Sequence, residues 1–245
     1  VQQQNPRAAR AVDAAVTMKP TERLAEAAAP DGTRLTLLRH DGAYYMSADG
    51  AELMSTRRPN SEVHLAELAC TPVADRPAAR ALVGGLGFGF TLRAALRLLA
   101  PDATVVVAEL LRDVIDWNQH PEWGEALAGA TLRDPRVRLH HGDVRDVLRE
   151  SPGAFDAIML DVDNGAEPFT TAGNAGLYGE AGLRETAAAL RPGGVVAWWS
   201  VGEDRRFEAA ARRAGLTVTS HRRRVHATAK ASHVIITGRR EGGGP

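Results

Sequence analysis

The sequence has few of the features that mark secreted, metal-binding or membrane-spanning proteins. It contains one cysteine in 245 residues, so neither an intrachain disulfide framework nor a thiolate zinc site can form. Its longest apolar runs, at 104–111 and 194–199, are far shorter than the roughly 20 residues needed to cross a bilayer. Lysine plus arginine and aspartate plus glutamate both number 30, so no net charge draws the protein toward nucleic acid or acidic membranes. We therefore expect a soluble, cytoplasmic globular protein with no membrane partner.

The two ends of the chain carry little hydrophobic pattern. Residues 1–17 have polar side chains where a signal peptide needs an apolar core, and Met18, followed by KPTERLAEA, resembles a natural start. The last residues, 241–245, read EGGGP. We expect 1–17 to be a flexible extension and 241–245 a flexible tail.

Residues 18–75 have the pattern of a small β unit followed by a short helix. Asp41-Gly42 and Asp49-Gly50 are strong hairpin signals, and they predict an antiparallel unit of two or three strands. Such a unit is too small to stand alone and must pack on the rest of the chain. Asn60 or Ser61 is expected to cap the helix EVHLAELAC. Its apolar face is predicted to comprise Val63, Leu65, Ala66 and Leu68.

From residue 76 to 240, short apolar strands alternate with amphipathic helices. Such repeated β–α units predict a parallel sheet covered on both faces. The last two strands have no helix between them, which predicts an antiparallel pair at the sheet edge. Strands are expected near 80–84, 104–109, 136–140, 156–161, 194–199, 216–220 and 232–237, and helices over 91–100, 111–127, 143–150, 179–190 and 204–214.

The segment ALVGGLGFGF at 81–90 carries the strongest sign of a ligand. Gly85, Gly87 and Gly89 follow an expected strand and precede an expected helix, where glycine lets the backbone approach a ligand and turn sharply. Together with Leu86 and Phe88 between them, they are candidate ligand-binding residues. A tight turn without a ligand is the alternative.

Acidic residues follow the next two strands. Glu109, beside Leu110, ends the strand VVVAE, where a carboxylate can accept hydrogen bonds from both ribose hydroxyls of a nucleoside. Asp143, beside Val144, lies where it can meet the adenine amino group, and it can also cap the following helix. Ligands of open α/β sheets bind at the carboxyl ends of the strands, so this convergence predicts a bound adenosine.

The fourth strand of this domain ends in a cluster of polar residues. Asp161 closes the strand FDAIMLD, and Asp163 and Asn164 follow directly. Close carboxylates hold a cationic amine, or share a proton so that one acts as a base. We therefore predict that Asp161 and Asp163 are catalytic and that Asn164 contacts the substrate, with solvated loop acids as the alternative.

Together, these motifs resemble a known family. GGLGFGF, VVVAE, HHGDVRD, LDVDNG and LRPGGVVAWW, in this order, resemble class I S-adenosylmethionine-dependent transferases, and ELMSTRRPNSEVHLAELA resembles the spermidine synthase family in particular. The resemblance implies an α/β, Rossmann-like class I methyltransferase fold with a mostly parallel seven-stranded sheet, an antiparallel edge strand and a preceding β-hairpin unit. It also implies that the glycine loop holds the methionine part of the donor, Glu109 the ribose and Asp143 the adenine, while Asp161 orients or deprotonates the attacking amine.

The sequence departs from the family at two places. Spermidine synthases resemble GGGDGG in the first loop, where the aspartate grips the amine of decarboxylated S-adenosylmethionine; Gly87 stands at that position here. A carboxylate there would repel the carboxylate of intact S-adenosylmethionine, so its absence favours methyl transfer to a small amine. DVDNG also replaces the usual acidic pair followed by proline, which argues against the polyamine-binding geometry of the family. The hairpin region, in contrast, favours aminopropyl transfer from the decarboxylated donor.

Two further functions share the same sequence features. A nucleoside-binding module without turnover would use the glycines and Asp161 for affinity alone. A nicotinamide dehydrogenase would share the glycines and the acid, but it lacks an evident Tyr-Lys or His-Arg catalytic set. The histidines lack metal-ligand spacing with carboxylates, so we expect no metal site.

Several other residues have two possible roles. Trp117 either lies against the adenine or packs in the core. Tyr178 and Phe169 are candidate acceptor contacts, because the Gly-containing loop 162–177 is able to close over an acceptor. For Phe169, an ordinary loop anchor is the alternative. Trp198 and Trp199 should face opposite sides of their strand. We expect a homodimer. The basic segment 203–245 lacks the aromatic residues usual for base stacking, so it should be a solvated face or an oligomer contact rather than a nucleic-acid surface.

Overall fold

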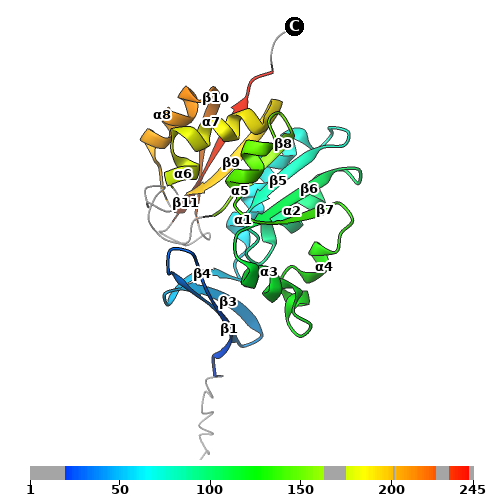
Figure 1. Ribbon diagram of the computed structural model, residues 1–245, viewed down its shortest axis with the longest axis vertical. Helices are drawn as coiled ribbons and strands as arrows, with labels where there is room; N and C mark the ends of the chain where they lie inside the picture. Colours follow the sequence, from blue (N-terminus) through cyan, green and yellow to red (C-terminus); the bar gives the residue numbers. More distant parts are fainter. Residues whose placement is uncertain (1–19, 163–174, 201, 225–231, 243–245) are drawn as a thin grey trace, which may run out of the picture.

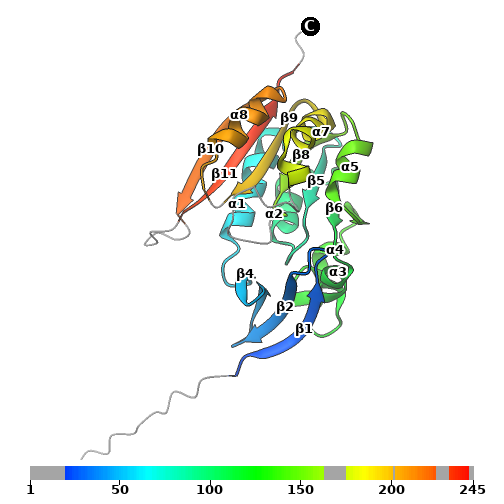
Figure 2. The same cartoon turned by 60° about the vertical axis from the view of Figure 1, so that its left-hand side comes forward.

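The computed structural model describes residues 20–162, 175–200, 202–224 and 232–242. Within them the chain forms two sheets, one antiparallel with four strands and one with seven strands. Figures 1 and 2 show the small sheet beneath the larger one, at the end where the loops after β5 (Arg80–Gly84), β6 (Thr104–Glu109) and β8 (Phe155–Leu160) lie. The predicted extension 1–17, and residues 243–245 of the predicted tail, lie outside the described residues.

The small sheet is built from hairpins whose turns the sequence predicts. Asp41-Gly42 and Asp49-Gly50 have positive φ at both residues, as the two-residue turns of twisted hairpins require. The sheet has one strand more than the two or three expected. The strand that the sequence analysis missed is the first, ERLAEAA, because alanine and glutamate have little intrinsic preference for strands. In chain order the strands are β1 (Glu22–Ala28), β2 (Arg34–His40), β3 (Ala43–Ala48) and β4 (Ala51–Ser55).

Helix α1 (Asn60–Cys70) connects the two sheets, and it differs from the prediction in its cap and its buried face. Neither Asn60 nor Ser61 caps it, because Pro59 holds the N-cap position and has no side-chain acceptor. Its buried residues are Glu62, Leu65, Ala66, Ala69 and Cys70, which recur at the helical period. Val63 and Leu68 are only partly buried. The buried face therefore begins with a carboxylate.

The large sheet has the order β10-β11-β9-β8-β5-β6-β7 and confirms the predicted fold class. Strands β7, β6, β5, β8 and β9 are parallel. The antiparallel pair lies at the sheet edge as predicted, and the strand that opposes its neighbours, β11, lies one position inside that edge. The remaining strands are β7 (Val137–His141), β9 (Leu190–Ser200), β10 (Leu216–Arg224) and β11 (Ser232–Arg240).

Helices cover both faces of this sheet because its strands are apolar on both sides. In β5, Ala81 and Val83 pack with α1 and α2 (Phe90–Leu98), whereas Leu82 packs with α5 (Val144–Glu150) and α7 (Glu180–Ala189). Trp198 and Trp199 lie on opposite faces, as predicted. The other helices are α3 (Arg112–Gln119), α4 (Gly129–Leu132), α6 (Ala175–Tyr178) and α8 (Arg205–Arg213), with short 3-10 turns at Thr71–Val73 and Gly124–Ala126.

The predicted helix 111–127 is wrong in its second half. Helix α3 ends at Gln119, and His120 is extended with φ −64° and ψ 135°. Pro121 is the cause, because a proline disfavours the helical conformation of the residue before it. The chain then turns back through 124–126 into α4, which lies beside the glycine loop.

Candidate functional site

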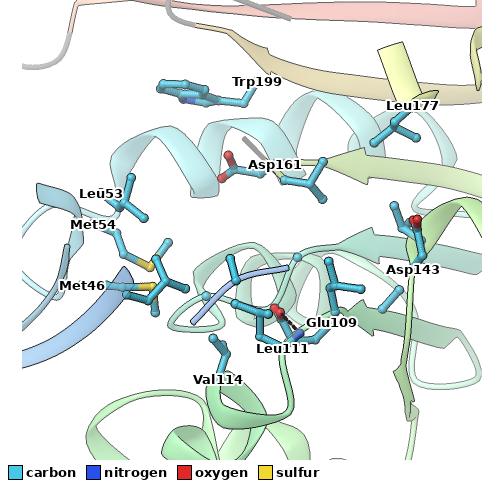
Figure 3. A pocket seen from close by; sticks show the side chains of 18 of the residues that line it. Met46, Leu53, Met54, Glu109, Leu111, Val114, Asp143, Asp161, Leu177 and Trp199 are labelled. Atoms are coloured by element: carbon cyan, nitrogen blue, oxygen red, sulfur yellow. Dashed lines mark hydrogen bonds between the residues drawn. The ribbon is translucent and has the colours of Figure 1, made fainter. Parts of the chain in front are cut away.

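A cavity of about 510 Å³ lies between the two sheets. Figure 3 shows Asp161 near its centre, with Met46, Leu53 and Met54 of the small sheet on one side and Asp143 and Leu177 on the other. The volume falls within the range of roughly 300–1,000 Å³ typical of ligand sites. Gly85, Gly87, Glu109, Leu110, Asp143, Val144 and Asp161, all predicted from the sequence, line it together.

Gly85 begins the turn that opens the cavity between β5 and α2. Its φ is +87°, and a Cβ atom there would lie 2.7 Å from the backbone oxygen of Asp161. This proximity follows from the pairing of β5 with β8, which places the ends of the two strands side by side. Gly89 has φ +70° at the N-cap of α2, and a Cβ atom there would overlap Ala128. Both positions therefore require glycine.

Gly87, between them, faces the small sheet. Its φ is +49°, and a Cβ atom there would lie 2.6 Å from the Cε atom of Met54. The position that holds an acid in the resembled family thus contacts a flexible apolar side chain here. Leu86 and Phe88 point away from the main cavity into the core, and the Phe88 ring packs edge-to-face on Phe90 at 6.2 Å.

Glu109 ends β6 and ties two segments of the site together. Its Oε2 atom accepts a hydrogen bond from the Leu86 amide at 2.8 Å, and its Oε1 atom accepts one from the Leu111 amide at 2.9 Å. The side chain is buried, and burial raises the pKa of Glu109 although these backbone N–H groups act to lower it. A carboxylate has about four acceptor sites in all, so these two hydrogen bonds do not use its full capacity.

Asn118 holds the glycine loop from the opposite side. Its Nδ2 atom donates to the carbonyl of Gly87 at 2.8 Å, and its Oδ1 atom accepts from the Ala128 amide at 2.9 Å. The neighbouring Trp117 packs in the core and is not among the residues that line the cavity. Of its two possible roles, core packing is therefore the one observed. From the sequence, Asn118 is considered only as the neighbour of Trp117 near the adenine, and nothing in its spacing points to the loop 31 residues earlier.

Asp143 caps α5, as predicted, and also lies at the cavity. It is the N-cap of α5, where its carboxylate accepts from the Arg145 amide at 2.8 Å, and it also lines the cavity. The two are compatible because a carboxylate has several acceptor positions. Leu110, which is half exposed, and Val144 also line the cavity.

Asp161 follows the last residue of β8, and its amide donates to the Gly84 carbonyl at 3.2 Å. Asp163, Asn164 and Phe169 lie outside the described residues. Tyr178 is described, but its ring packs in the core against Phe207, with centroids 6.1 Å apart, and Leu177 lines the cavity instead.

One carboxylate and one apolar wall of the cavity were not predicted from the sequence. The carboxylate is Glu62 of α1, which is 7% exposed and lines the cavity. The sequence signal that could have revealed Glu62 is its spacing. It lies one helical turn before Leu65 and Ala66, which places it on the same buried face. The apolar wall comes from the small sheet and the end of β9, and it comprises Leu35, Met46, Leu53, Met54 and Trp199.

The described ranges hold no group of three or more metal-ligating side chains close enough to bind an ion. They also contain no helix that is both long and apolar enough to cross a membrane.

Sequence comparison relates part of the chain to aminopropyltransferases. It is 38% identical over 117 residues to a polyamine aminopropyltransferase of Nitrosomonas europaea, an alignment that covers 48% of this chain and 34% of that protein. It is 34% identical over 116 residues to a spermine synthase of Arabidopsis thaliana, covering 47% and 30%. The chain thus spans about a third of the length of the curated relatives it matches. No family model matches it.

Structural comparison extends the likeness to nearly the whole chain. A crystal structure of a spermidine synthase with a transition state analogue superposes with a TM-score of 0.70 and 15% identity, covering 90% of this chain and 73% of that one. The spermidine synthase from Thermotoga maritima gives a TM-score of 0.67 at 14% identity, with the same coverage.

The strand order and these superpositions define a class I S-adenosylmethionine-dependent transferase fold. Within that class, about half of the chain is similar in sequence to polyamine aminopropyltransferases and a spermine synthase, and its fold, small sheet included, is similar to that of spermidine synthases.

Proposed function

We propose that this protein is a transferase that moves an aminopropyl group from decarboxylated S-adenosylmethionine to a small amine. The observation that carries the proposal is the charge of the cavity. Six carboxylates line it, those of Asp31, Glu52, Glu62, Glu109, Asp143 and Asp161, against one basic side chain, Arg145, in the described part of the chain. Arg145 is itself paired with Glu185 at 3.4 Å, and among the acids Glu52 is paired with Arg58 at 2.6 Å.

An acidic cavity distinguishes between the two donors. Decarboxylated S-adenosylmethionine brings only positive charge, whereas the intact donor adds a carboxylate for which the described lining offers no uncommitted cation. The names of the relatives support the same choice, since two of them are a polyamine aminopropyltransferase and a spermine synthase. The methyl transfer favoured by the sequence rests on Gly87 alone.

The residues at the strand ends fit an adenosyl group. Gly85 leaves the backbone open where a Cβ atom would fill the turn, and Glu109 presents a carboxylate held by two backbone amides. In this proposal Glu109 binds the ribose, Asp143 lies toward the adenine and the glycine loop holds the aliphatic part. The donor supplies a sulfonium-bound carbon open to displacement.

Asp161 is the proposed base of the reaction. The acceptor nitrogen forms a bond to the sulfonium-bound carbon, the carbon–sulfur bond breaks, and its electron pair remains on sulfur as a thioether. The acceptor amine is protonated at neutral pH and must lose a proton before it attacks. Asp161 lies where it can hold the ammonium and then take or pass on that proton. Asp163 stays a second candidate for this role.

Product analysis tests the function directly. The purified protein is incubated with putrescine and either donor, and the products are identified by mass spectrometry. The proposal expects spermidine and methylthioadenosine from the decarboxylated donor only. Formation of a methylated amine and S-adenosylhomocysteine would show that the protein transfers a methyl group instead. Nucleoside binding without any product would favour the binding module. The homodimer and the cytoplasmic location stay predictions.

A further inference from the structure

A small recess opens from the cavity beside the glycine loop. It has a volume of about 30 Å³, and its acidic side chains are Glu62 and Asp161. Gly85, Gly87 and Met54 lie next to them, and the rest of the wall comprises Leu86, Phe88, Phe90 and Thr91. Since roughly 10–15 Å³ on this measure holds one water molecule, the recess is large enough for one group of that size. A primary ammonium group is such a group.

Glu62 is in an unfavourable environment for a carboxylate. Only 7% of it is exposed, its side-chain partner is the Ser61 hydroxyl, which donates to Oε2 at 2.6 Å, and no basic side chain of the described residues pairs with it. Burial raises the pKa of Glu62. A buried carboxylate with neutral partners reduces stability, so its presence on the buried face of α1 needs a reason.

A purely structural role does not provide that reason. The helix dipole and the backbone N–H groups of the first turn favour a charged Glu62, but burial outweighs them and the pKa of Glu62 is still raised. The other buried positions of α1 carry leucine, alanine and cysteine. A carboxylate among them, lining the cavity as well as the recess, is a feature of a site that receives positive charge.

We infer that Glu62 is a substrate-binding residue and that, together with Asp161, it holds an ammonium group of a substrate in the recess beside Gly87. An ammonium group has three N–H donors and one positive charge, which match two carboxylates across a space of this size. The inference rests on the proposed function and names the group that the acidic end of the site recognises. Both the decarboxylated donor and an amine acceptor carry such a group.

Calorimetry with three ligands separates the two sources. Methylthioadenosine has the nucleoside without an ammonium group, decarboxylated S-adenosylmethionine has both, and putrescine is titrated into the protein saturated with methylthioadenosine. Each ligand is measured with the wild type, Glu62→Gln and Glu62→Asp. The matched control is Glu67→Gln, the same substitution at an exposed position of the same helix.

We expect Glu62→Gln to lower the affinity for one of the two ammonium ligands by 10-fold or more and to change the affinity for methylthioadenosine by less than 2-fold. Weaker binding of the decarboxylated donor assigns the recess to the donor, and weaker binding of putrescine assigns it to the acceptor. Glu62→Asp, which keeps the charge, should lose less affinity for that ligand, and Glu67→Gln should lose none.

Two results would overturn the inference while the proposed function stands. One is unchanged affinity of Glu62→Gln for both ammonium ligands, and the other is an equal loss for methylthioadenosine, which would mean that Glu62 only shapes the cavity. If the wild type binds neither nucleoside ligand, the proposed function itself fails, and the inference fails with it. Thermal unfolding of Glu62→Gln confirms that the variant is folded, and Glu62→Asp provides the same test if it is not.

Discussion

The Oε2 atom of Glu109 accepts a hydrogen bond from the backbone amide of Leu86 at 2.8 Å, across the 23 positions that separate them. This bond joins the end of β6 to the glycine loop after β5. One carboxylate therefore both fixes the loop and presents acceptor positions to the cavity. Its removal should affect the loop and the ligand together.

Glu109→Gln should weaken nucleoside binding. The amide nitrogen of glutamine would face one of the two backbone N–H groups that the carboxylate accepts, and one acceptor toward the ribose would be lost. We expect a loss of about 1.5–3 kcal/mol, which is roughly 10- to 150-fold in the Kd for methylthioadenosine measured by calorimetry. Glu150→Gln, at an exposed helix end, is the control. An unchanged Kd would restrict Glu109 to a structural role.

Asp161→Asn should separate turnover from binding. The substitution keeps the shape and removes the charge that holds and deprotonates the acceptor amine. The rate of aminopropyl transfer should fall by about 10²-fold or more, while the affinity for methylthioadenosine changes by less than about 3-fold. Asp116→Asn, on the exposed surface of α3, should leave both unchanged. If Asp161→Asn instead weakens methylthioadenosine and preserves turnover of bound substrate, Asp161 is a binding residue and Asp163 becomes the candidate base.

Gly85→Ala should abolish the donor site through a backbone collision. Alanine pays about 1–2 kcal/mol for a left-handed conformation, and at position 85 its Cβ atom would also lie 2.7 Å from the Asp161 oxygen. Gly215→Ala is matched to it, because Gly215 has φ +92° with no atom within 4 Å of an added Cβ. Thermal unfolding should show a loss of stability in both variants, whereas calorimetry should show lost methylthioadenosine binding only for Gly85→Ala. Equal binding by the two variants would contradict the close contact at Gly85.

Glu62→Gln should stabilise the protein at neutral pH. Burial raises the pKa of Glu62 in the folded state, so the folded protein binds the proton more tightly than the unfolded chain does. The stability from this group is complete below the unfolded pKa of about 4.3 and is lost as pH rises through the higher folded pKa. The Tm of Glu62→Gln should therefore match the wild type near pH 4 and exceed it progressively toward neutral pH. A Tm difference that does not change with pH would show that Glu62 is not a buried titrating group.

The local pattern of the sequence determined the α/β sheet and the positions of the strand-end residues. Runs of apolar residues specify buried strands, and glycine or an acid at the end of a strand is close in sequence to the element that positions it. For that reason Gly85, Glu109, Asp143 and Asp161 could be predicted to meet, since parallel strands bring their carboxyl ends to one edge.

Only the tertiary structure decided which distant residues complete the site. Glu62 lines the recess because α1 packs with its 62, 65 and 66 face inward. Asn118 of α3 reaches the Gly87 carbonyl, and the turn after Pro121 brings the Ala128 amide to the same side chain. Met54 meets the glycine loop only once the small sheet packs beneath the large one. Periodicity is a property of neighbouring residues, whereas these contacts depend on how whole elements bury their apolar faces against one another, and no single segment encodes that arrangement.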